Sequence, residues 1–163
     1  MKPTRALVLG VALAAGLHAQ QTGSEKPFRY NGNGHLYFAT GACQHGYAHV
    51  GVGGGGEGFL WRGLALGADL GYHSFVSDTG FGLMSLHVGY HFVDRTKPKK
   101  LDPFVNFAPL GAYIANGIGP AGSLGGGLNW WFKPRMALRT EVRFQALNGD
   151  EALTMFRIGL SFR

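Results

Sequence analysis

In several segments polar and apolar residues alternate, so that every second position is polar. We call each of the two alternating sets of positions a parity, and charged residues of both signs share the polar one. Between positions 138 and 144, one parity is apolar and the other carries Arg139, Glu141 and Arg143. Burial would make pairing among such charges necessary, because a lone buried charge is strongly destabilising. We expect a buried ion-pair network formed by Glu57, Asp69, Arg139, Glu141, Arg143 and Arg157.

The last two polar-parity segments suggest how this network is arranged. A simple hairpin after position 147 would place Arg143 opposite Arg157, with Glu141 diagonal to Arg157. Two arginines so close together need a carboxylate between them. We expect Glu57 to reach across and provide it.

Other residues that could carry chemistry lack the spacing that it requires. His73 and Ser74 are adjacent, so in a strand they point to opposite faces and form no nucleophile–base pair. The glycines at 53–56 are not followed by the Lys-Ser/Thr of a phosphate-binding loop. We therefore predict no catalytic residue.

Three histidines, His73, His87 and His91, lie on the polar parity of neighbouring segments. This pattern is compatible with a metal site or a pH-sensitive plug. Interior histidines that are satisfied by hydrogen bonds are the favoured interpretation, with His87 beside Asp69. We predict no metal site and no cofactor.

The composition is typical of a chain with little water-facing surface. Charged residues make up 15% of the 163 residues, and 28 residues are glycine. Soluble domains carry about 25% charged residues and about 7% glycine. No apolar run of about 20 residues is present, so a closed barrel is the remaining structure that could span a membrane.

The first residues have the layout of a secretory signal. Lys2 and Arg5 form a basic head, residues 6–17 are apolar, and Ala19 is a small residue before a polar segment. Without the two basic residues the net charge falls from +6 to +4, which does not suggest a nucleic-acid partner. We predict a signal peptide at 1–19, a polar leader at 20–34 and one barrel domain at 35–163.

From about position 35 onward the hydrophobic period is two, with repeated breaks, which is typical of short antiparallel strands. The alternation is clear at 64–72, 84–92, 138–144 and 154–162, and weaker at 35–41, 48–60, 104–112 and 123–132. Pro109 counts against the strand at 104–112, because proline cannot donate to a strand ladder. The pattern predicts an all-β fold, an eight-stranded antiparallel up-and-down transmembrane β-barrel.

The lysines indicate which parity faces outward. Those beyond the signal are Lys26, Lys97, Lys99, Lys100 and Lys133, and all lie outside the expected strands. A water-facing wall should carry lysine and glutamate, so we expect the apolar parity to face lipid. The alternative is a secreted soluble barrel that binds a small apolar ligand and faces its polar parity outward.

Aromatic side chains gather beside one set of connections between the expected strands. Such rings prefer the membrane–water boundary, where barrels carry them as girdles. The expected girdle consists of Trp61, Tyr90, Phe92, Trp130, Trp131 and Phe132.

Several of these segments resemble the OmpA/OmpX-type family of eight-stranded outer-membrane barrels, also called the porin-like β-barrel domain. The matching parts are the strand at 125–130, the turn at 133–135, the segment around Glu141, and the last strand ending at Phe162. The chain departs from the family pattern at Arg163, one residue beyond the expected terminal aromatic. We expect no peptidoglycan-binding domain after the barrel.

The resemblance implies a Gram-negative outer-membrane location and contacts with outer-membrane lipids. It also implies recognition by the barrel-insertion machinery through the strand ending at Phe162. We expect a monomer with a structural or surface-interaction role and a lumen largely closed by ion pairs. Some related barrels act on lipid A, so a lipid A-modifying enzyme is a third hypothesis.

Overall fold

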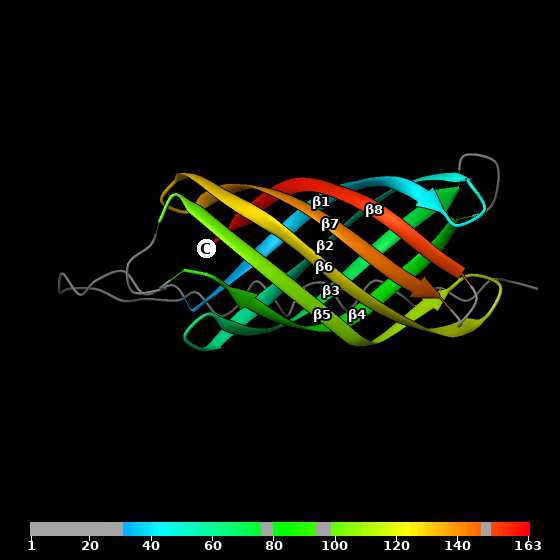
Figure 1. Cartoon of the computed structure of the whole chain (residues 1–163), viewed down its shortest axis with the longest axis horizontal. Coiled ribbons are helices and arrows are strands. Elements are labelled where there is room, and N and C mark those ends of the chain that lie inside the picture. Colours follow the sequence, from blue (N-terminus) through cyan, green and yellow to red (C-terminus); the bar gives the residue numbers. More distant parts are fainter. Residues whose placement is uncertain (1–30, 76–79, 94–98, 148–150) are drawn as a thin grey trace, which may run out of the picture.

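A computed structural model of the protein describes residues 31–75, 80–93, 99–147 and 151–163. Its strands form one closed barrel in chain order, and the last strand pairs with the first (Figure 1). All neighbouring strands are antiparallel, so the predicted fold class is confirmed. The strands are β1 (Gly32–Cys43), β2 (Ala48–Trp61), β3 (Leu64–Phe75), β4 (Gly80–His91), β5 (Leu101–Ile114), β6 (Ile118–Lys133), β7 (Met136–Leu147) and β8 (Glu151–Phe162).

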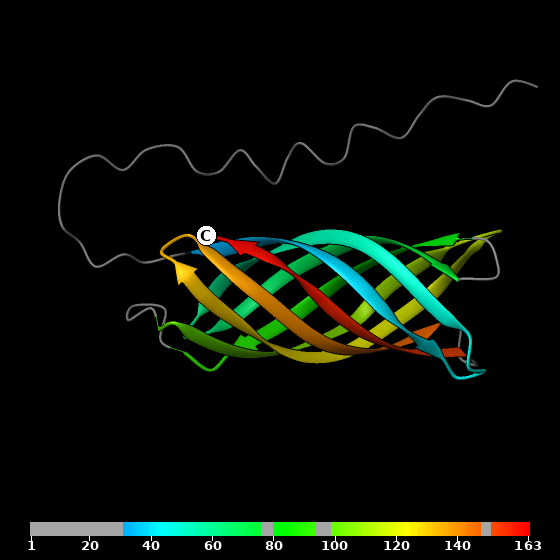
Figure 2. The same ribbon diagram turned by 90° about the horizontal axis from the view of Figure 1, so that it is seen from above.

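The described connections lie at two opposite ends of the barrel. Those at 44–47 and 115–117 share one end, and those at 62–63 and 134–135 share the other end with the C-terminus (Figures 1 and 2). In the β2–β3 turn, Arg62 and Gly63 both have positive φ, 42° and 98°. Two such residues form the tight turn whose twist matches that of the flanking strands. We call the end with 44–47 the loop end and the other the turn end.

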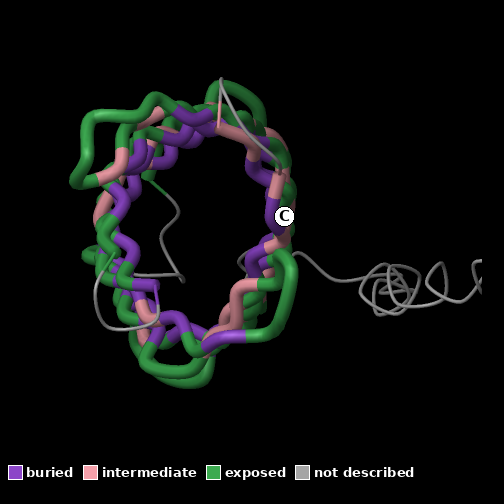
Figure 3. The backbone as a smooth tube through the Cα atoms, turned by 90° about the vertical axis from the view of Figure 1, so that its right-hand side faces the viewer, coloured by how far each residue is buried: buried purple, intermediate pink, exposed green. Residues whose placement is uncertain are grey.

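Outside the bulges, side chains alternate between the two faces of the wall, because successive residues of a strand point in opposite directions. Leu36 and Phe144 on the outside are 63% and 58% exposed, whereas Asp69 and Arg143 on the inside are 3% and 0% exposed. Buried and exposed positions therefore alternate around the ring (Figure 3). This distribution is the reverse of a soluble barrel and contradicts the soluble ligand-binding alternative.

Two features of the strands go beyond what the sequence pattern predicted. β1 begins at Gly32, three residues before the expected barrel start, and places Asn33 of the expected leader inside the lumen. Pro109 lies in β5 where the pairing with β6 shifts between Ala108 and Gly111. A bulge of this kind leaves a residue without a ladder partner, so it accommodates proline inside a strand.

The predicted signal peptide and most of the predicted leader lie outside the described residues. Among the residues that are described, we find no helix long and apolar enough to cross a membrane.

Candidate functional site: the barrel lumen

The six charged residues predicted to pair all point into the lumen and are buried. They come from β2, β3, β7 and β8, and each occupies an inward position because of the two-residue period. The shortest contact is within β7, where Nε of Arg143 donates to Oε1 of Glu141 at 2.6 Å. Nη2 of Arg139 lies 3.4 Å from the other oxygen of the same carboxylate. Glu141 therefore lies between two arginines of its own strand.

One contact of this network crosses the whole lumen. Nη1 of Arg143 on β7 donates to Oδ2 of Asp69 on β3 at 2.7 Å. These strands are four positions apart in a ring of eight, so they form opposite walls. Nη1 of Arg157 on β8 also approaches Oδ2 of Asp69, at 3.7 Å. A single carboxylate thus links β3 to both strands that carry the arginines.

The structure corrects two details of the expected network. Arg157 pairs directly with Glu141, whereas Arg143 pairs with Met155, because Leu147 pairs with Glu151 and shifts the register by two residues. The carboxylate that meets both arginines is Asp69 rather than Glu57. The expected place of Glu57 between them was therefore wrong.

Glu57 instead organises the part of the lumen toward the turn end. Its Oε1 accepts from Nδ2 of Asn33 at 2.8 Å and from Nη1 of Arg139 at 3.4 Å. Nε2 of His91 donates to the same oxygen at 3.1 Å. Nδ1 of His91 lies 2.8 Å from Oδ1 of Asp102, so each ring nitrogen of His91 faces a carboxylate.

Several of these partners were not predicted from the sequence. Asp102 precedes the strand expected at 104–112, yet it is buried in β5, and Nδ2 of Asn129 also donates to it at 3.2 Å. Asp102, Phe104 and Asn106 share one buried parity, which is the signal that could have identified Asp102. His35 was also missed, and its Nε2 donates to Asp69 at 2.7 Å. His87 does lie beside Asp69, with Nδ1 3.4 Å from Oδ2.

The lumen changes character toward the loop end, where its side chains are apolar. The residues involved lie near the strand ends at that end of the barrel. We call this cluster the apolar layer: Phe81, Leu83, Ala121, Leu147, Leu153 and Met155, with Cys43, Phe75 and Tyr113 packed against it. The apolar layer was not predicted from the sequence.

Five of the six aromatic residues expected in the girdle lie on the outer wall near the turn end. Trp61, Tyr90, Phe92, Trp130 and Phe132 are between 43% and 62% exposed. Trp131 is the exception, because the alternation turns its side chain inward, where it is 4% exposed. The Arg163 guanidinium lies 3.9 Å from the Trp131 ring centroid and its Nε donates to the Pro134 carbonyl, so the residue beyond the terminal aromatic packs against Trp131 at the turn end.

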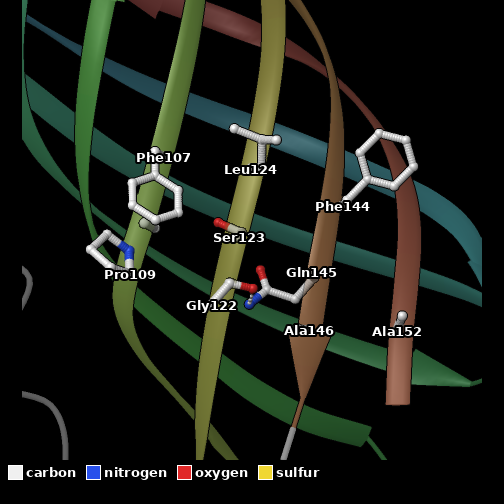
Figure 4. A pocket seen from close by; sticks show the side chains of 10 residues that line it. Phe107, Pro109, Gly122, Ser123, Leu124, Phe144, Gln145, Ala146 and Ala152 are labelled. Carbon is white, nitrogen blue, oxygen red and sulfur yellow. Dashed lines mark hydrogen bonds between the residues drawn. The ribbon is translucent and has the colours of Figure 1, made fainter. Parts of the chain in front are cut away.

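A shallow groove of about 380 Å³ lies on the outer wall where β5, β6, β7 and β8 run side by side (Figure 4). Phe107, Leu124 and Phe144 border it, and small residues such as Gly122 and Ala146 form its floor. No titratable side chain lines it, so within the described residues it offers an apolar surface without groups for catalysis.

The residue types needed for other chemistry are separated by the wall. His73 is buried in the lumen, and Ser74 lies on the other side of β3. Across the described ranges, no group of three or more His, Cys, Asp or Glu side chains is placed to hold a metal ion. What the lumen side chains form is a set of hydrogen bonds between charged groups. These hydrogen bonds join opposite walls of the barrel.

No protein-family model and no curated protein sequence matches the chain. Solved structures do match it. Neisserial surface protein A (NspA) is 9% identical with a TM-score of 0.61, covering 80% of this chain and 94% of that one. The N-terminal β-barrel domain of Pseudomonas aeruginosa OprF is 20% identical with a TM-score of 0.58, covering 81% and 98%.

A third match is the outer membrane enzyme PagL, at 12% identity and a TM-score of 0.51, covering 79% of this chain and 99% of that chain. All three share the closed eight-stranded barrel rather than close sequence similarity. With its apolar outer wall and polar lumen, the chain has the fold of the eight-stranded outer-membrane β-barrels of the OmpA/OmpX type.

Proposed function

We propose that this protein is an integral outer-membrane barrel with a structural or surface-interaction role and a lumen closed to solutes. The contact between Arg143 and Asp69 carries the proposal, because it joins opposite walls at 2.7 Å. Eight strands leave an interior just wide enough for side chains to fill. The apolar layer lies across the same lumen toward the loop end, which supports a second barrier.

A catalytic role is the alternative, because PagL is an enzyme with the same fold. A shared fold does not transfer an activity, which depends on the site. An enzyme acting on lipid needs its catalytic groups on the lipid-facing wall. All histidines of the described strands, His35, His49, His73, His87 and His91, are buried inside, which favours the non-enzymatic role.

The partners that we propose follow from the side chains exposed on the outer wall of the barrel. Outer-membrane lipids would cover the apolar face, with the aromatic residues at the turn end near the lipid headgroups. The barrel-insertion machinery would recognise the last strand through Phe162, which is exposed at the end of β8. We further propose that the protein acts as a monomer.

The proposed function predicts that the protein needs detergent for extraction and does not conduct. The protein should be recovered from the outer-membrane fraction, and its reconstitution in planar bilayers should give no stable porin-like current steps. A large porin reconstituted in parallel serves as the positive control. Recovery as a soluble monomer, or conductance like that of the porin, would contradict the proposal.

The orientation of the barrel gives a second prediction. Lys99, Lys100, Lys133, Arg62 and Arg135 lie at the turn end, and the loop-end connections at 44–47 and 115–117 contain no lysine or arginine. We expect the turn end to face the periplasm, the side from which barrel-insertion machinery reads the last strand.

Cysteine labelling of intact cells can measure this orientation, in a Cys43→Ser background that removes the native thiol. A membrane-impermeant maleimide should label Gly117→Cys, because a Cβ there meets no atom within 4 Å. It should spare the matched variant Lys99→Cys until the outer membrane is permeabilised. The opposite labelling pattern would reverse the proposed topology.

A further inference from the structure

Basic side chains gather at one edge of the outer wall, at the turn end. We call four of them the basic arc: Lys99, Lys100, Lys133 and Arg135, all of which are exposed. Lys99 and Lys100 directly precede β5, Lys133 ends β6, and Arg135 lies in the turn that follows. The start of β5 and the β6–β7 turn lie at the same end of the barrel as the C-terminus (Figure 1). Cations from separate parts of the chain are therefore brought to one edge of the barrel.

Backbone hydrogen bonds hold the segments of the basic arc side by side. The amide of Trp131 donates to the carbonyl of Lys100 at 2.7 Å, which joins the start of β5 to the end of β6. The amide of Arg163 donates to the carbonyl of Arg135 at 3.2 Å, which joins the end of the chain to the turn. Neighbouring strands lie about 4.8 Å apart, so the arc spans roughly 10 Å from β5 to β7. Long basic side chains on this span can reach one anionic group together.

No carboxylate in the described part of the chain neutralises the basic arc. Its four side chains form no ion pair with another described residue. Glu57 and Asp102, the carboxylates toward this end in the described ranges, turn into the lumen and are 6% and 1% exposed. Among these residues, the outer edge at the arc carries positive charge alone, which favours an anionic partner.

The basic arc lies at the border of the apolar outer wall. Lys100 directly precedes Leu101, and Lys133 directly follows Phe132. Leu101, Trp130 and Phe132 are all exposed on the outer face. A strand advances about 3.3 Å per residue, so the cations begin within one residue of the apolar wall. Exposed aromatic rings mark the membrane–water boundary, which places the arc at the level of the lipid headgroups. An anion that contacts both the arc and this wall must carry apolar chains.

We propose that the basic arc binds the phosphate headgroup of an anionic phospholipid, whose acyl chains lie over Leu101, Trp130 and Phe132. Lysine and arginine donate charge-assisted hydrogen bonds to phosphate oxygens. Clusters of basic residues beside a bilayer select anionic lipids. The lipid belongs to the leaflet at the turn end, which is the periplasmic leaflet in the orientation proposed above. The site rests on the proposed insertion of the barrel into the membrane, and it adds which charge class of lipid this end retains.

Two exposed tryptophans allow the basic arc to be compared with the opposite side of the barrel. Trp130 of β6 lies beside the arc, and Trp61 ends β2. These strands are four positions apart in the closed ring of eight. The cation beside Trp61 is Arg62, whose guanidinium lies 4.9 Å from the ring centroid. Trp131 faces the lumen and is 4% exposed. Trp130 and Trp61 can therefore each report on the lipid at their own side.

Quenching of tryptophan fluorescence by brominated lipids tests the site in the protein reconstituted into vesicles. Brominated phosphatidylglycerol is compared with brominated phosphatidylethanolamine, which carries no net charge, in the Trp61→Phe protein that retains Trp130. We expect phosphatidylglycerol to be preferred at Trp130 by about tenfold or more, because four basic residues act together and each is worth up to about fivefold beside an anionic surface. In the Trp130→Phe protein, which retains Trp61 and its one neighbouring cation, the preference should be about fivefold or less.

Substitutions in the basic arc separate its role from that of net charge. The Lys100→Gln/Lys133→Gln double variant should lower the preference at Trp130 to that at Trp61, whereas Lys100→Arg/Lys133→Arg should retain it. Arg62→Gln is the control, because it removes a cation of the same end on the other side of the barrel and should leave the preference at Trp130 unchanged. The heat-dependent gel shift of folded barrels reports whether each variant is folded, and Lys133→Gln alone replaces a double variant that does not fold.

The outcomes distinguish failure of the lipid site from failure of the proposed function. Equal quenching by the two lipids at Trp130, a preference at Trp61 as large as that at Trp130, or a preference that survives the glutamine substitutions would overturn the lipid site while leaving the barrel inserted. If neither lipid quenches Trp61 or Trp130, the proposed membrane insertion is contradicted, and the site with it.

Discussion

The Glu141→Ala variant is expected to lose about 3–5 kcal/mol of folded-state stability, because it removes the carboxylate between buried arginines. Nε of Arg143 would lose its 2.6 Å acceptor, and Nη2 of Arg139 would lose its partner at 3.4 Å. Arg157, which pairs with Glu141 across β7 and β8, would be left with Arg143 sharing Asp69 as the carboxylate between them. The measurement is the temperature at which the folded band disappears in a heat-modifiability gel in detergent.

Glu151→Ala is the matched control for that variant. Glu151 is an exposed carboxylate of the same hairpin, so its removal should change the unfolding temperature little. We also expect Glu141→Ala to raise single-channel conductance, because water would enter the space that the carboxylate leaves. Equal unfolding temperatures for the two variants, together with unchanged conductance, would argue against a lumen held closed by ion pairs.

The Gly159→Val variant is expected to prevent the barrel from closing. Gly159 of β8 pairs with Tyr37 of β1, at the seam where the last strand meets the first. A Cβ at this glycine would collide with the carbonyl oxygen of Leu36 and lie 2.7 Å from Cα of Tyr37. Backbone atoms cannot move aside as a flexible side chain can, so the ladder between β1 and β8 should break.

Loss of closure would expose the edges of β1 and β8, and open strand edges promote aggregation. We therefore expect Gly159→Val to give no heat-resistant folded band and to be lost from the outer-membrane fraction. Gly34→Ala is the control at the same seam, because its nearest contact would be an ordinary 3.7 Å. A folded, membrane-inserted Gly159→Val protein would show that the seam tolerates a branched side chain.

Much of the wall could be predicted from the sequence because a strand has a short and strict period. The clean alternation at 138–144 and 154–162 lies within β7 and β8, and the inward and outward parities agree with the structure. The weaker strands also formed, including β5 with Pro109. A proline can occur there because the bulge removes the need for its missing hydrogen-bond donor.

The same two-residue period also signals two features that were not predicted. Trp131 stands between Trp130 and Phe132, so alternation alone turns it inward and excludes it from the girdle. Phe81, Leu83, Leu153 and Met155 are large apolar residues on the inward parity, near strand ends. Their inward parity indicates an apolar part of the lumen. They contact one another because the ends of their strands lie at the same level of the barrel.

Which side chains face the lumen and which face outward follows from the amino-acid pattern, because parity is a local property of each strand. Which charges meet depends on how the strands are paired and closed into a ring. The length of the β7–β8 hairpin set the register that pairs Glu141 with Arg157. Closure of eight strands into a ring then placed β3 opposite β7, so that Asp69, and not Glu57, reaches Arg143. Contacts across a lumen depend on shear and closure of the whole sheet, which no single strand encodes.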